Sequence, residues 1–568
     1  MINNPRVFLW ILLAVALWVN YEAWMRDYGA KPTPVSASAQ SAAGSKATNG
    51  APTGLDAAIP QVPASGAVGA SAPAAAGAAV TPAASTDASN SAGTVHVKTD
   101  VLDLDISLQG GTIQRADLLK YPKVKGGSEP VRLMNRDSEQ TLYLLQSGLT
   151  GQGTAAHPTH LATYTSSQQD YTLGANSTEL RVPLTWTDDN GITVTKTYVF
   201  RPGMYRIDVE YDVANQSSAP WQAAPYAQIL RQDPPSEHSM FNPATYAFRG
   251  PATYDGTRYR KLDIEDKDDL TSTDTTNGWV AALEHHFVGA IVPPADTGYR
   301  FTLGAEGRKY LLSAAGPLRT IAPGASDKFG QTFFIGPKLQ SQLEGTGPEL
   351  KRVADYGKLT ILAAPLFWLL EKVHDFFGNW GVAIVVVTII LKGAFYPLSE
   401  ASGKSMAKMK NLSPRIKNLQ ETYKDDREKL GRAMMELYQR EKINPVAGCL
   451  PMIIQIPVFL AFYWVLLESV EMRQAPFMGW INDLSSRDPF FVLPVIMAGA
   501  MFLQYKLNPA PPDPVQAKIF MIMPLAMSVM FAFFPAGLVL YWVTNTIVSI
   551  AQQWNINRRI SKAPVRKT

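Results

Sequence analysis

Cysteine and charge are both scarce in this chain of 568 residues. Cys449 is the only cysteine, so no intramolecular disulfide and no cysteine-based zinc site can form. Charged residues make up 18% of the chain, and 52 Lys+Arg against 48 Asp+Glu give no electrostatic case for a nucleic-acid-binding protein. Long apolar runs gather in the last ~210 residues, whereas the ~240 residues before them are polar. This uneven distribution excludes a soluble cytoplasmic enzyme.

Residues with catalytic chemistry are missing from the long apolar runs near the C-terminus. These runs contain no His, Asp or Glu, although an intramembrane protease needs a Ser/His pair, two Asp or a His-Glu-x-x-His motif. Gly403-Lys404-Ser405 is similar to the end of a phosphate-binding loop, but Leu398 stands where that motif requires glycine. The polar middle of the chain has no Gly-x-Ser-x-Gly motif and no metal-binding histidine spacing. We therefore expect no enzyme activity, no cofactor and no metal.

The chain begins with a short apolar run from Val7 to Val19. A secretory signal peptide would continue into small residues at a cleavage site, but here the bulky segment Asn20–Arg26 follows. Trp18, Tyr21 and Trp24 form an aromatic belt of the kind found at membrane interfaces. We predict an uncleaved transmembrane anchor over residues 1–28, with a cleaved signal peptide as the alternative.

Aromatic residues are absent from the next segment, which consists almost entirely of Ala, Ser, Gly, Pro and Thr. Such a composition cannot bury enough apolar surface to offset the entropy cost of ordering the chain. We predict a disordered tether over residues 29–94, without a binding site of its own.

Strand-like alternation dominates residues 95–345. Leu102–Leu108 and Ile207–Val213 place an apolar residue at every second position, as a half-buried strand does. Asn190-Gly191 between two further runs, Leu184–Thr187 and Ile192–Phe200, predicts a type I′ hairpin turn. We predict one mostly antiparallel, all-β sandwich here, with further strands at 287–292 and 329–335.

The remaining apolar runs predict a membrane-embedded helical region. Residues 350–377 mix apolar and charged positions and are typical of an amphipathic helix lying in the membrane interface. Five runs follow that we interpret as transmembrane helices: Trp380–Leu398, Val446–Leu467, Phe490–Tyr505, Ile519–Phe534 and Leu538–Ala551. With the anchor, this predicts a polytopic α-helical membrane protein with six transmembrane helices and a large β domain outside the membrane.

Lysine and arginine counts predict the orientation. Segment 399–445 carries 11 Lys+Arg, and the chain ends in a basic tail over 561–568. The loop 468–489 has only Arg473 and Arg487 against four acidic residues. The positive-inside rule therefore places both termini and segment 399–445 in the cytoplasm, and the β domain on the outer side.

Segment 399–445 has helical periodicity rather than the pattern of a disordered loop. Apolar residues recur at three- and four-residue steps on each side of Asp425-Asp426, which predicts a cytoplasmic helical hairpin. Its methionine-rich apolar face suits varied partners, while its basic residues suit anionic lipid headgroups; both interpretations stay open. The residues we single out in this hairpin are Met406, Lys408, Met409 and Arg415.

Lys392 is an isolated charge at the end of an apolar run. A lysine at the centre of a transmembrane helix costs about 2.5–3.5 kcal/mol on insertion scales. Its side chain either extends toward the inner interface or faces a water-filled cavity between helices. Polar or aromatic residues of the same and other runs are the candidate neighbours in such a cavity: Thr388, Gln455, Tyr541, Trp542, Thr544 and Asn545. Because these runs hold no acid, the cavity would stay cationic and attract an acidic segment.

Several motifs in the C-terminal part resemble the YidC/Oxa/Alb family of membrane protein insertases. They cover most of residues 350–560 in the order found in that family. The motifs are Gly378–Gly381, Lys392-Gly393 with Tyr396–Leu398, Ser405–Met409, Asn444–Phe459 and Pro535–Trp542. The predicted anchor, tether and β domain resemble the Gram-negative bacterial members.

The resemblance implies a protein that inserts and folds nascent membrane proteins in the bacterial inner membrane, alone or with the Sec translocon, and without a cofactor. It implies a five-helix insertase core over 378–560, with a hydrophilic groove, and a periplasmic domain of the supersandwich fold. Lys392 stands where the family usually has Arg, so the charge is kept but the fork of donors is lost. Thr388 and Trp542 match groove positions for substrate contact.

The resemblance also directs the choice of further residues and partners. We expect Gln455, Phe459, Tyr541 and Asn545 to contribute to substrate contact in the groove. Expected partners are nascent membrane proteins, the Sec translocon and membrane lipids, with the ribosome as a further candidate for the basic tail; we expect no specific nucleic acid and no small-molecule substrate. The alternative functions are a small-solute transporter, although no inverted repeat is found, and a membrane-anchored periplasmic chaperone or scaffold.

Overall fold

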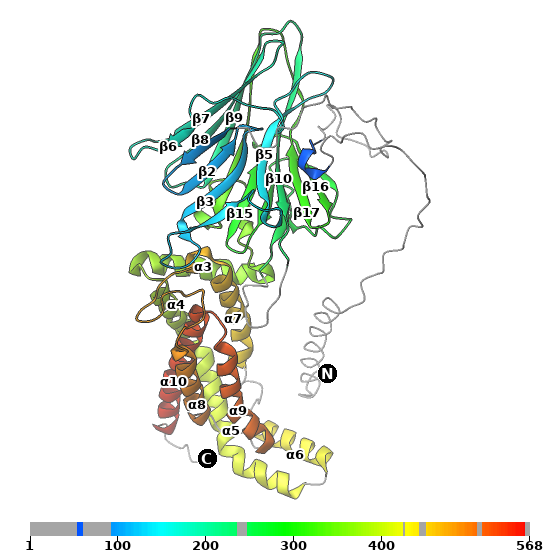
Figure 1. The fold of residues 1–568 in the computed structure, drawn as a ribbon. Coiled ribbons are helices and arrows are strands. Elements are labelled where there is room, and N and C mark those ends of the chain that lie inside the picture. Colours follow the sequence, from blue (N-terminus) through cyan, green and yellow to red (C-terminus); the bar gives the residue numbers. More distant parts are fainter. Residues whose placement is uncertain are drawn as a thin grey trace, which may run out of the picture. The chain divides into compact units, whose positions relative to one another are not determined.

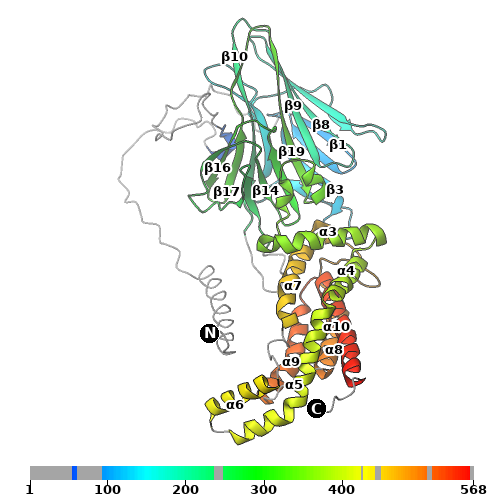
Figure 2. The same cartoon turned by 180° about the vertical axis from the view of Figure 1, so that it is seen from behind.

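The computed structural model describes residues 54–60, 93–235, 247–423, 426–441, 450–507 and 514–562. The predicted anchor, most of the predicted tether and the last six residues lie outside these ranges. Within them, strands occupy the first part of the chain and helices the second (Figures 1 and 2).

The β domain contains two sheets. The 11-stranded sheet has the order β13-β16-β17-β10-β5-β3-β2-β1-β6, with β18 paired to β10 and β4 paired to β3. The 8-stranded sheet has the order β12-β11-β14-β15-β19-β9-β8-β7. All pairings between these strands are antiparallel except that of β1 with β6.

The strands have the following bounds: β1 (Thr94–Lys98), β2 (Leu102–Ser107), β3 (Thr112–Pro122), β4 (Pro130–Met134), β5 (Tyr143–Thr150), β6 (Asp170–Thr172), β7 (Leu180–Thr187), β8 (Ile192–Phe200), β9 (Arg206–Asn215), β10 (Trp221–Gln232), β11 (Gly250–Tyr254), β12 (Tyr259–Lys261), β13 (Ser272–Thr275), β14 (Trp279–Leu283), β15 (Phe287–Val292), β16 (Tyr299–Glu306), β17 (Lys309–Ala315), β18 (Arg319–Ile321) and β19 (Ser326–Pro337).

One large core lies between the two sheets and takes side chains from both. Leu145 and Ile229 come from the 11-stranded sheet, and Val209 and Ile291 from the 8-stranded sheet. In β9, buried and half-buried residues alternate strictly, as the sequence pattern of this strand predicts. The predicted all-β sandwich is therefore confirmed.

The turn between β7 and β8 corrects one prediction. The hairpin forms, with Thr187 paired to Thr193, but it is not closed by a type I′ turn. Gly191 has a φ of 93°, whereas Asn190 is not among the described residues with positive φ, and a type I′ turn needs positive φ at both. The Asp188 carboxylate instead accepts hydrogen bonds from the backbone N–H groups of Asn190 and Ile192, which favours a longer loop.

The tether prediction is wrong for residues 54–60. Leu55–Ala57 forms a short 3-10 turn, η1, which lies against β16 and β17 of the β domain. This turn could not be predicted, because the segment has no periodic pattern of its own and its order depends on side chains about 90–250 positions further along the chain.

The C-terminal part is helical. A short helix and two 3-10 turns lead into it: α2 (Gln340–Glu344), η4 (Leu350–Val353) and η5 (Gly357–Leu359). The longer elements are α3 (Thr360–Phe377), α4 (Trp380–Ala394), α5 (Tyr396–Thr422), α6 (Arg427–Arg440), α7 (Leu450–Glu468), α8 (Val492–Leu507), α9 (Pro514–Phe531) and α10 (Ala536–Lys562). The helix predicted over 350–377 thus starts only at Thr360.

The run Trp380–Leu398, predicted to be one helix, is broken at Phe395. The chain bends by 58° between α4 and α5. Pro397 lies in the first turn of α5 and explains this break, because it has no N–H to continue the hydrogen-bond ladder of α4.

Among the described residues, no single helix is both long and apolar enough to cross a membrane. The bent pair Trp380–Ala394 and Tyr396–Ser405 meets both requirements when its two helices are taken together. Three shorter apolar helices are present at Ile453–Glu468, Val492–Leu507 and Met521–Phe531. The count of six transmembrane helices therefore stays a prediction.

A lysine is fully buried in the β-domain core. Lys196 of β8 has no exposed surface, and its Nζ donates to the carbonyl oxygens of Gly110 (2.9 Å), Ser147 (3.0 Å) and Gly111 (3.3 Å). Because these carbonyls belong to the other sheet and the turn beside it, Lys196 joins the two sheets. Burial lowers the pKa of Lys196 well below its ordinary value.

Replacing Lys196 by methionine should destabilise the β domain by about 3 kcal/mol. Methionine fills the space but removes a donor from three buried carbonyl oxygens, of which only that of Gly111 keeps another side-chain donor, the Tyr198 hydroxyl. The matched control is Lys328→Met, since the Lys328 side chain is 84% exposed and forms only a surface ion pair. In denaturant unfolding of the full chain, the midpoint of the β-domain transition should fall clearly for Lys196→Met and hardly change for Lys328→Met. Equal midpoints for the two variants would contradict this role for Lys196.

Candidate functional site

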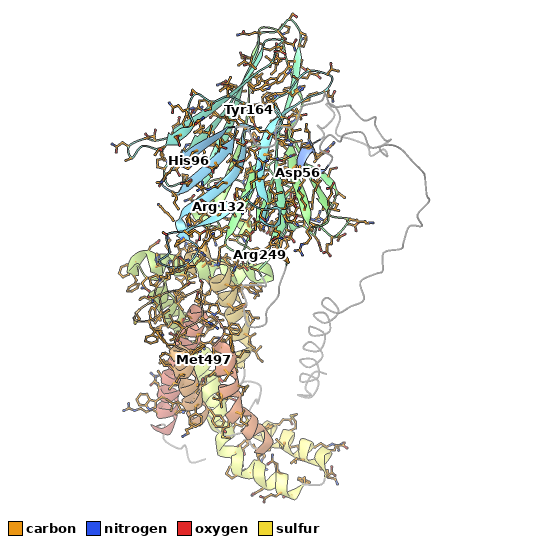
Figure 3. All side chains as sticks on the ribbon, in the orientation of Figure 1. Asp56, His96, Arg132, Tyr164, Arg249 and Met497 are labelled. Atoms are coloured by element: carbon orange, nitrogen blue, oxygen red, sulfur yellow. The ribbon has the colours of Figure 1, made fainter. Side chains whose placement is uncertain are left out.

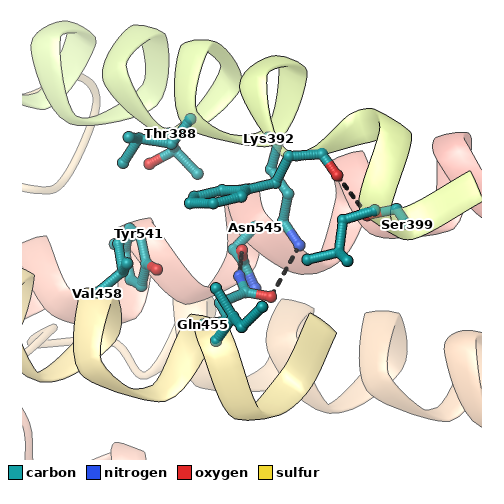
Figure 4. A pocket seen from close by; sticks show the side chains of 11 residues that line it. Thr388, Lys392, Ser399, Gln455, Val458, Tyr541 and Asn545 are labelled. Carbon is teal, nitrogen blue, oxygen red and sulfur yellow. Dashed lines mark hydrogen bonds between the residues drawn. The ribbon is translucent and has the colours of Figure 1, made fainter. Parts of the chain in front are cut away.

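Lys392 lies in a pocket formed by four helices of the C-terminal part (Figure 4). Its lining includes Thr388 one turn earlier on α4, Ser399 on α5, Gln455 and Val458 on α7, and Tyr541 and Asn545 on α10. Leu391, Phe395, Leu398 and Ile454 complete the lining. We call this site the Lys392 pocket; it encloses about 430 Å³, counting its open mouth.

The Lys392 ammonium group donates its hydrogen bonds to neutral side chains. Its Nζ donates to Ser549 Oγ at 2.8 Å and to Gln455 Oε1 at 3.2 Å, and the residue is only 9% exposed. Gln455 donates in turn to Asn545 Oδ1. No carboxylate of the described residues forms an ion pair with Lys392. The pocket therefore carries a desolvated positive charge that is hydrogen-bonded but not neutralised.

The backbone and the hydroxyl groups around Lys392 are also fixed. Gln552 Nε2 donates to the Lys392 carbonyl oxygen at 2.9 Å, in the last turn of α4. Thr388 is 1% exposed, and its hydroxyl donates to the Ile384 carbonyl oxygen at 2.6 Å, so its oxygen can only accept from a ligand. These contacts hold α4 against α10 where the charge lies.

An aromatic cluster borders the pocket beyond Tyr541. The rings of Phe459 and Trp542 are 5.0 Å apart, and Tyr541 stacks on Phe462 at 4.6 Å. Of these residues only Tyr541 lines the pocket. The indole N–H of Trp542 is buried and has no acceptor among the described residues. One border of the pocket is thus apolar and closely packed.

The structure brings together most of the groove residues that the sequence singled out. Thr388, Lys392, Gln455, Tyr541 and Asn545 share the pocket, whereas Phe459 and Trp542 pack beside it. Thr544 does not line the pocket, and its hydroxyl donates to the Leu540 carbonyl oxygen.

Sequence reasoning missed three polar residues of the site: Ser399, Ser549 and Gln552. Ser549 and Gln552 could have been predicted from their spacing along the sequence. Tyr541, Asn545, Ser549 and Gln552 follow one another at steps of four, four and three along α10, which places them on one helix face. Ser399 could not be found in this way because it lies beyond the bend at Phe395.

The residues predicted to form a cytoplasmic hairpin build helices α5 and α6. Leu412 and Ile416 of α5 are buried against Met434, Leu437 and Tyr438 of α6. Asp426 caps α6 by accepting from the Lys429 N–H at 3.0 Å.

The four hairpin residues singled out from the sequence are only partly described. Arg415 forms an exposed ion pair with Glu441 at 2.7 Å, and Met409 is half-buried. The side chains of Met406 and Lys408 lie outside the described residues.

Two family models and many relatives match this chain. Residues 94–369 match the YidC periplasmic domain, and residues 372–563 match the 60Kd inner membrane protein family. A membrane protein insertase YidC from Cupriavidus necator is 45% identical over 562 residues, which cover 98% of both chains. The chain belongs to the YidC family of membrane protein insertases.

A second relative agrees with this assignment: the YidC insertase of Thioalkalivibrio sulfidiphilus is 42% identical over 575 residues, covering 99% of both chains. The family, the insertase function and a β domain of the YidC periplasmic type are therefore as the sequence motifs indicated. A crystal structure of an active YidC insertase is similar over 84% of this chain and 93% of its own, at 18% identity and a TM-score of 0.37.

Replacing Lys392 by methionine should not weaken the packing of this YidC-family helical region. Methionine has a similar length, and a buried charge with only neutral partners contributes little net stability. Hydrogen exchange of α4 and α10 in the full chain should be unchanged or slower, as it should be for the control Lys506→Met on α8. Clearly faster exchange in the first variant alone would make Lys392 a structural connection between the helices.

Proposed function

We propose that this insertase receives the polar part of a nascent membrane protein in the Lys392 pocket. The observation that carries the proposal is a nearly buried cation whose described partners are the neutral side chains of Gln455 and Ser549. An incoming acidic group would gain an ion pair without first displacing another carboxylate. Thr388, Gln455, Asn545 and Tyr541 would supply further hydrogen-bonding groups, and Phe459 and Trp542 an apolar border.

The physical gain is a shorter passage through hydrocarbon. A polar segment has no hydrogen-bonding partners in the bilayer core, where each unsatisfied backbone group costs several kcal/mol. A hydrated pocket reaching into the membrane replaces part of that passage. The apolar part of the same nascent chain then moves into lipid, and its hydrophobic burial drives the process without a nucleotide or a covalent step.

The outer surfaces of the helices fit this proposal. Large apolar side chains are exposed on α7, α8 and α9, as expected for surfaces that face lipid. The most exposed of them are Val495 (69%), Leu525 (64%), Val529 (60%), Ile522 (59%) and Ile456 (50%). They give a nascent apolar segment a surface to move along while its polar part is held in the pocket.

The membrane arrangement belongs to the same proposal. Six transmembrane helices with both termini in the cytoplasm satisfy the counts of basic residues and place the β domain in the periplasm. α3 would lie in the interface, because its apolar residues Ile361 (86% exposed), Trp368 (58%) and Phe376 (82%) would otherwise face water.

The α5–α6 hairpin and the basic tail would bind partners on the cytoplasmic side. The α5–α6 hairpin, including Met406, Lys408, Met409 and Arg415, would receive nascent chains and contact anionic lipids on the cytoplasmic side. The basic tail would approach the ribosome, and the protein would act alone or with the Sec translocon.

Substitutions at Lys392 test the electrostatic part of the proposal. Lys392→Arg should preserve insertion, whereas Lys392→Met should reduce the insertion of a client with an acidic translocated tail by about tenfold or more, equivalent to about 1.4 kcal/mol. The loss should be much smaller for the same client with a neutral tail, because only the acidic group interacts with the charge. Protease protection of the translocated tail in proteoliposomes gives the measurement.

The control is Lys506→Met, which removes a lysine outside the pocket. It should insert both clients at the normal rate. Equal insertion of both clients by all four proteins would contradict a role for the charge.

A further inference from the structure

Residues 54–60 cover an apolar patch on the outer face of the 11-stranded sheet. Leu144 on β5, Leu230 on β10 and Leu311 on β17 are direct cross-strand neighbours. Their chain neighbours Leu145, Ile229 and Leu312 belong to the core between the sheets, so strand alternation turns this leucine row away from the core. Apolar rows on the outside of a sheet usually mark an interaction surface.

The segment 54–60 supplies the apolar cover for this row. Leu55 and Ala58 pack against Leu144, Leu230 and Leu311. Gly304 of β16 extends the row by pairing with Leu311, and a side chain at Gly304 would place its Cβ 3.7 Å from Leu55 Cδ2. Figure 1 shows η1 in blue beside β16, and Figure 3 labels Asp56 at this place.

Polar contacts fix the direction of the segment. The Asp56 carboxylate accepts from Lys309 Nζ at 2.6 Å, and the Asp56 carbonyl oxygen lies 3.2 Å from His160 Nε2. Gln228 Nε2 donates to the Ala58 carbonyl oxygen at 3.2 Å. The β domain therefore binds the Asp56 carboxylate and the backbone carbonyl oxygens of Asp56 and Ala58.

Two of the recognising side chains are buried and already oriented. His160 is 2% exposed, and its Nδ1 lies 2.7 Å from the Tyr226 hydroxyl, which leaves Nε2–H to donate to the segment. Burial lowers the pKa of His160 to about 4, so the ring is neutral near pH 7. Gln228 has no exposed surface, and its Nε2 also donates to Gln146 Oε1 at 2.7 Å. Tyr226 and Gln146, which belong to the β domain, thus orient both donors toward the segment.

We propose that the leucine row, together with Lys309, His160 and Gln228, is a peptide-binding site that residues 54–60 fill in cis. Its ligand is a short peptide with an aliphatic residue, then an acidic residue, then two small residues. Because the segment and the site belong to one chain, binding is intramolecular, so a weak contact is enough for occupancy. The proposal does not depend on the Lys392 pocket, and either can fail without the other.

Thiol labelling of the full chain tests the cis contact. In a Cys449→Ser background, Ala58→Cys places a small thiol against the leucine row, while Ile59→Cys is a matched control because Ile59 is 39% exposed. The thiol at 58 should react about tenfold or more slowly than the thiol at 59. Adding Leu55→Ser should bring the two rates together, and so should adding Lys309→Glu; combining Lys309→Glu with Asp56→Lys should restore the difference. Equal rates at 58 and 59 before any of these additions would overturn the proposal.

A free peptide tests the binding site itself. Gly-Leu-Asp-Ala-Ala-Ile-Pro with a photoreactive leucine, added at millimolar concentration, should cross-link to β10 and β17 of the Leu55→Ser chain. Labelling should be about fivefold or more weaker in the unsubstituted chain, where the cis segment competes, and weaker for a control peptide with Lys in place of Asp. Equal labelling by both peptides, or labelling elsewhere on the chain, would overturn the assignment of the site.

Discussion

The proposed function of the helical region depends on one interaction: a positive charge on α4 is held by uncharged groups of α7 and α10. Burying a charge costs several kcal/mol unless partners compensate for it, and a carboxylate would be the usual partner. Here the compensation comes from Gln455 and Ser549, with Asn545 holding the glutamine in place. This arrangement holds the Lys392 side chain in position and leaves its charge available, as the proposed binding of an acidic segment requires.

The β domain contains a lysine with no exposed surface, Lys196, and comparison with it shows what makes Lys392 different. Lys196 directs its ammonium group at three backbone carbonyl oxygens in a closed core, with the rings of Tyr164, Tyr198 and Tyr211 around it. Every donor of that lysine is used, so its role is to join two sheets. Lys392 has two side-chain acceptors and lies in an open pocket, so its environment can accept a further ligand. Burial of a lysine does not by itself indicate a functional site. What distinguishes Lys392 is the space beside its ammonium group, where a further hydrogen-bond acceptor can bind.

Sequence reasoning was reliable where one local pattern decides the structure. The alternation of apolar and polar residues predicted the β sandwich. The cost of a lysine in an apolar helix predicted polar neighbours around it, among them Thr388, Gln455, Tyr541 and Asn545. It failed where the outcome depends on distant parts of the chain. The order of residues 54–60 comes from a leucine row on three strands, and Ser399 reaches the pocket only because Pro397 bends the chain. The Asn190-Gly191 signal identified the hairpin but not its turn, since the Asp188 carboxylate stabilises a different loop.

The proposed function depends on water access to the Lys392 pocket. Val458 and Ile456 are two residues apart on α7 and thus at nearly the same depth, but only Val458 lines the pocket, while Ile456 is 50% exposed on the outer surface. In proteoliposomes of the Cys449→Ser chain, Val458→Cys should react with a water-soluble thiol reagent about tenfold or more faster than Ile456→Cys, because thiolates form in water and not in lipid. Equally slow reaction at both positions would show a dry pocket and contradict the account.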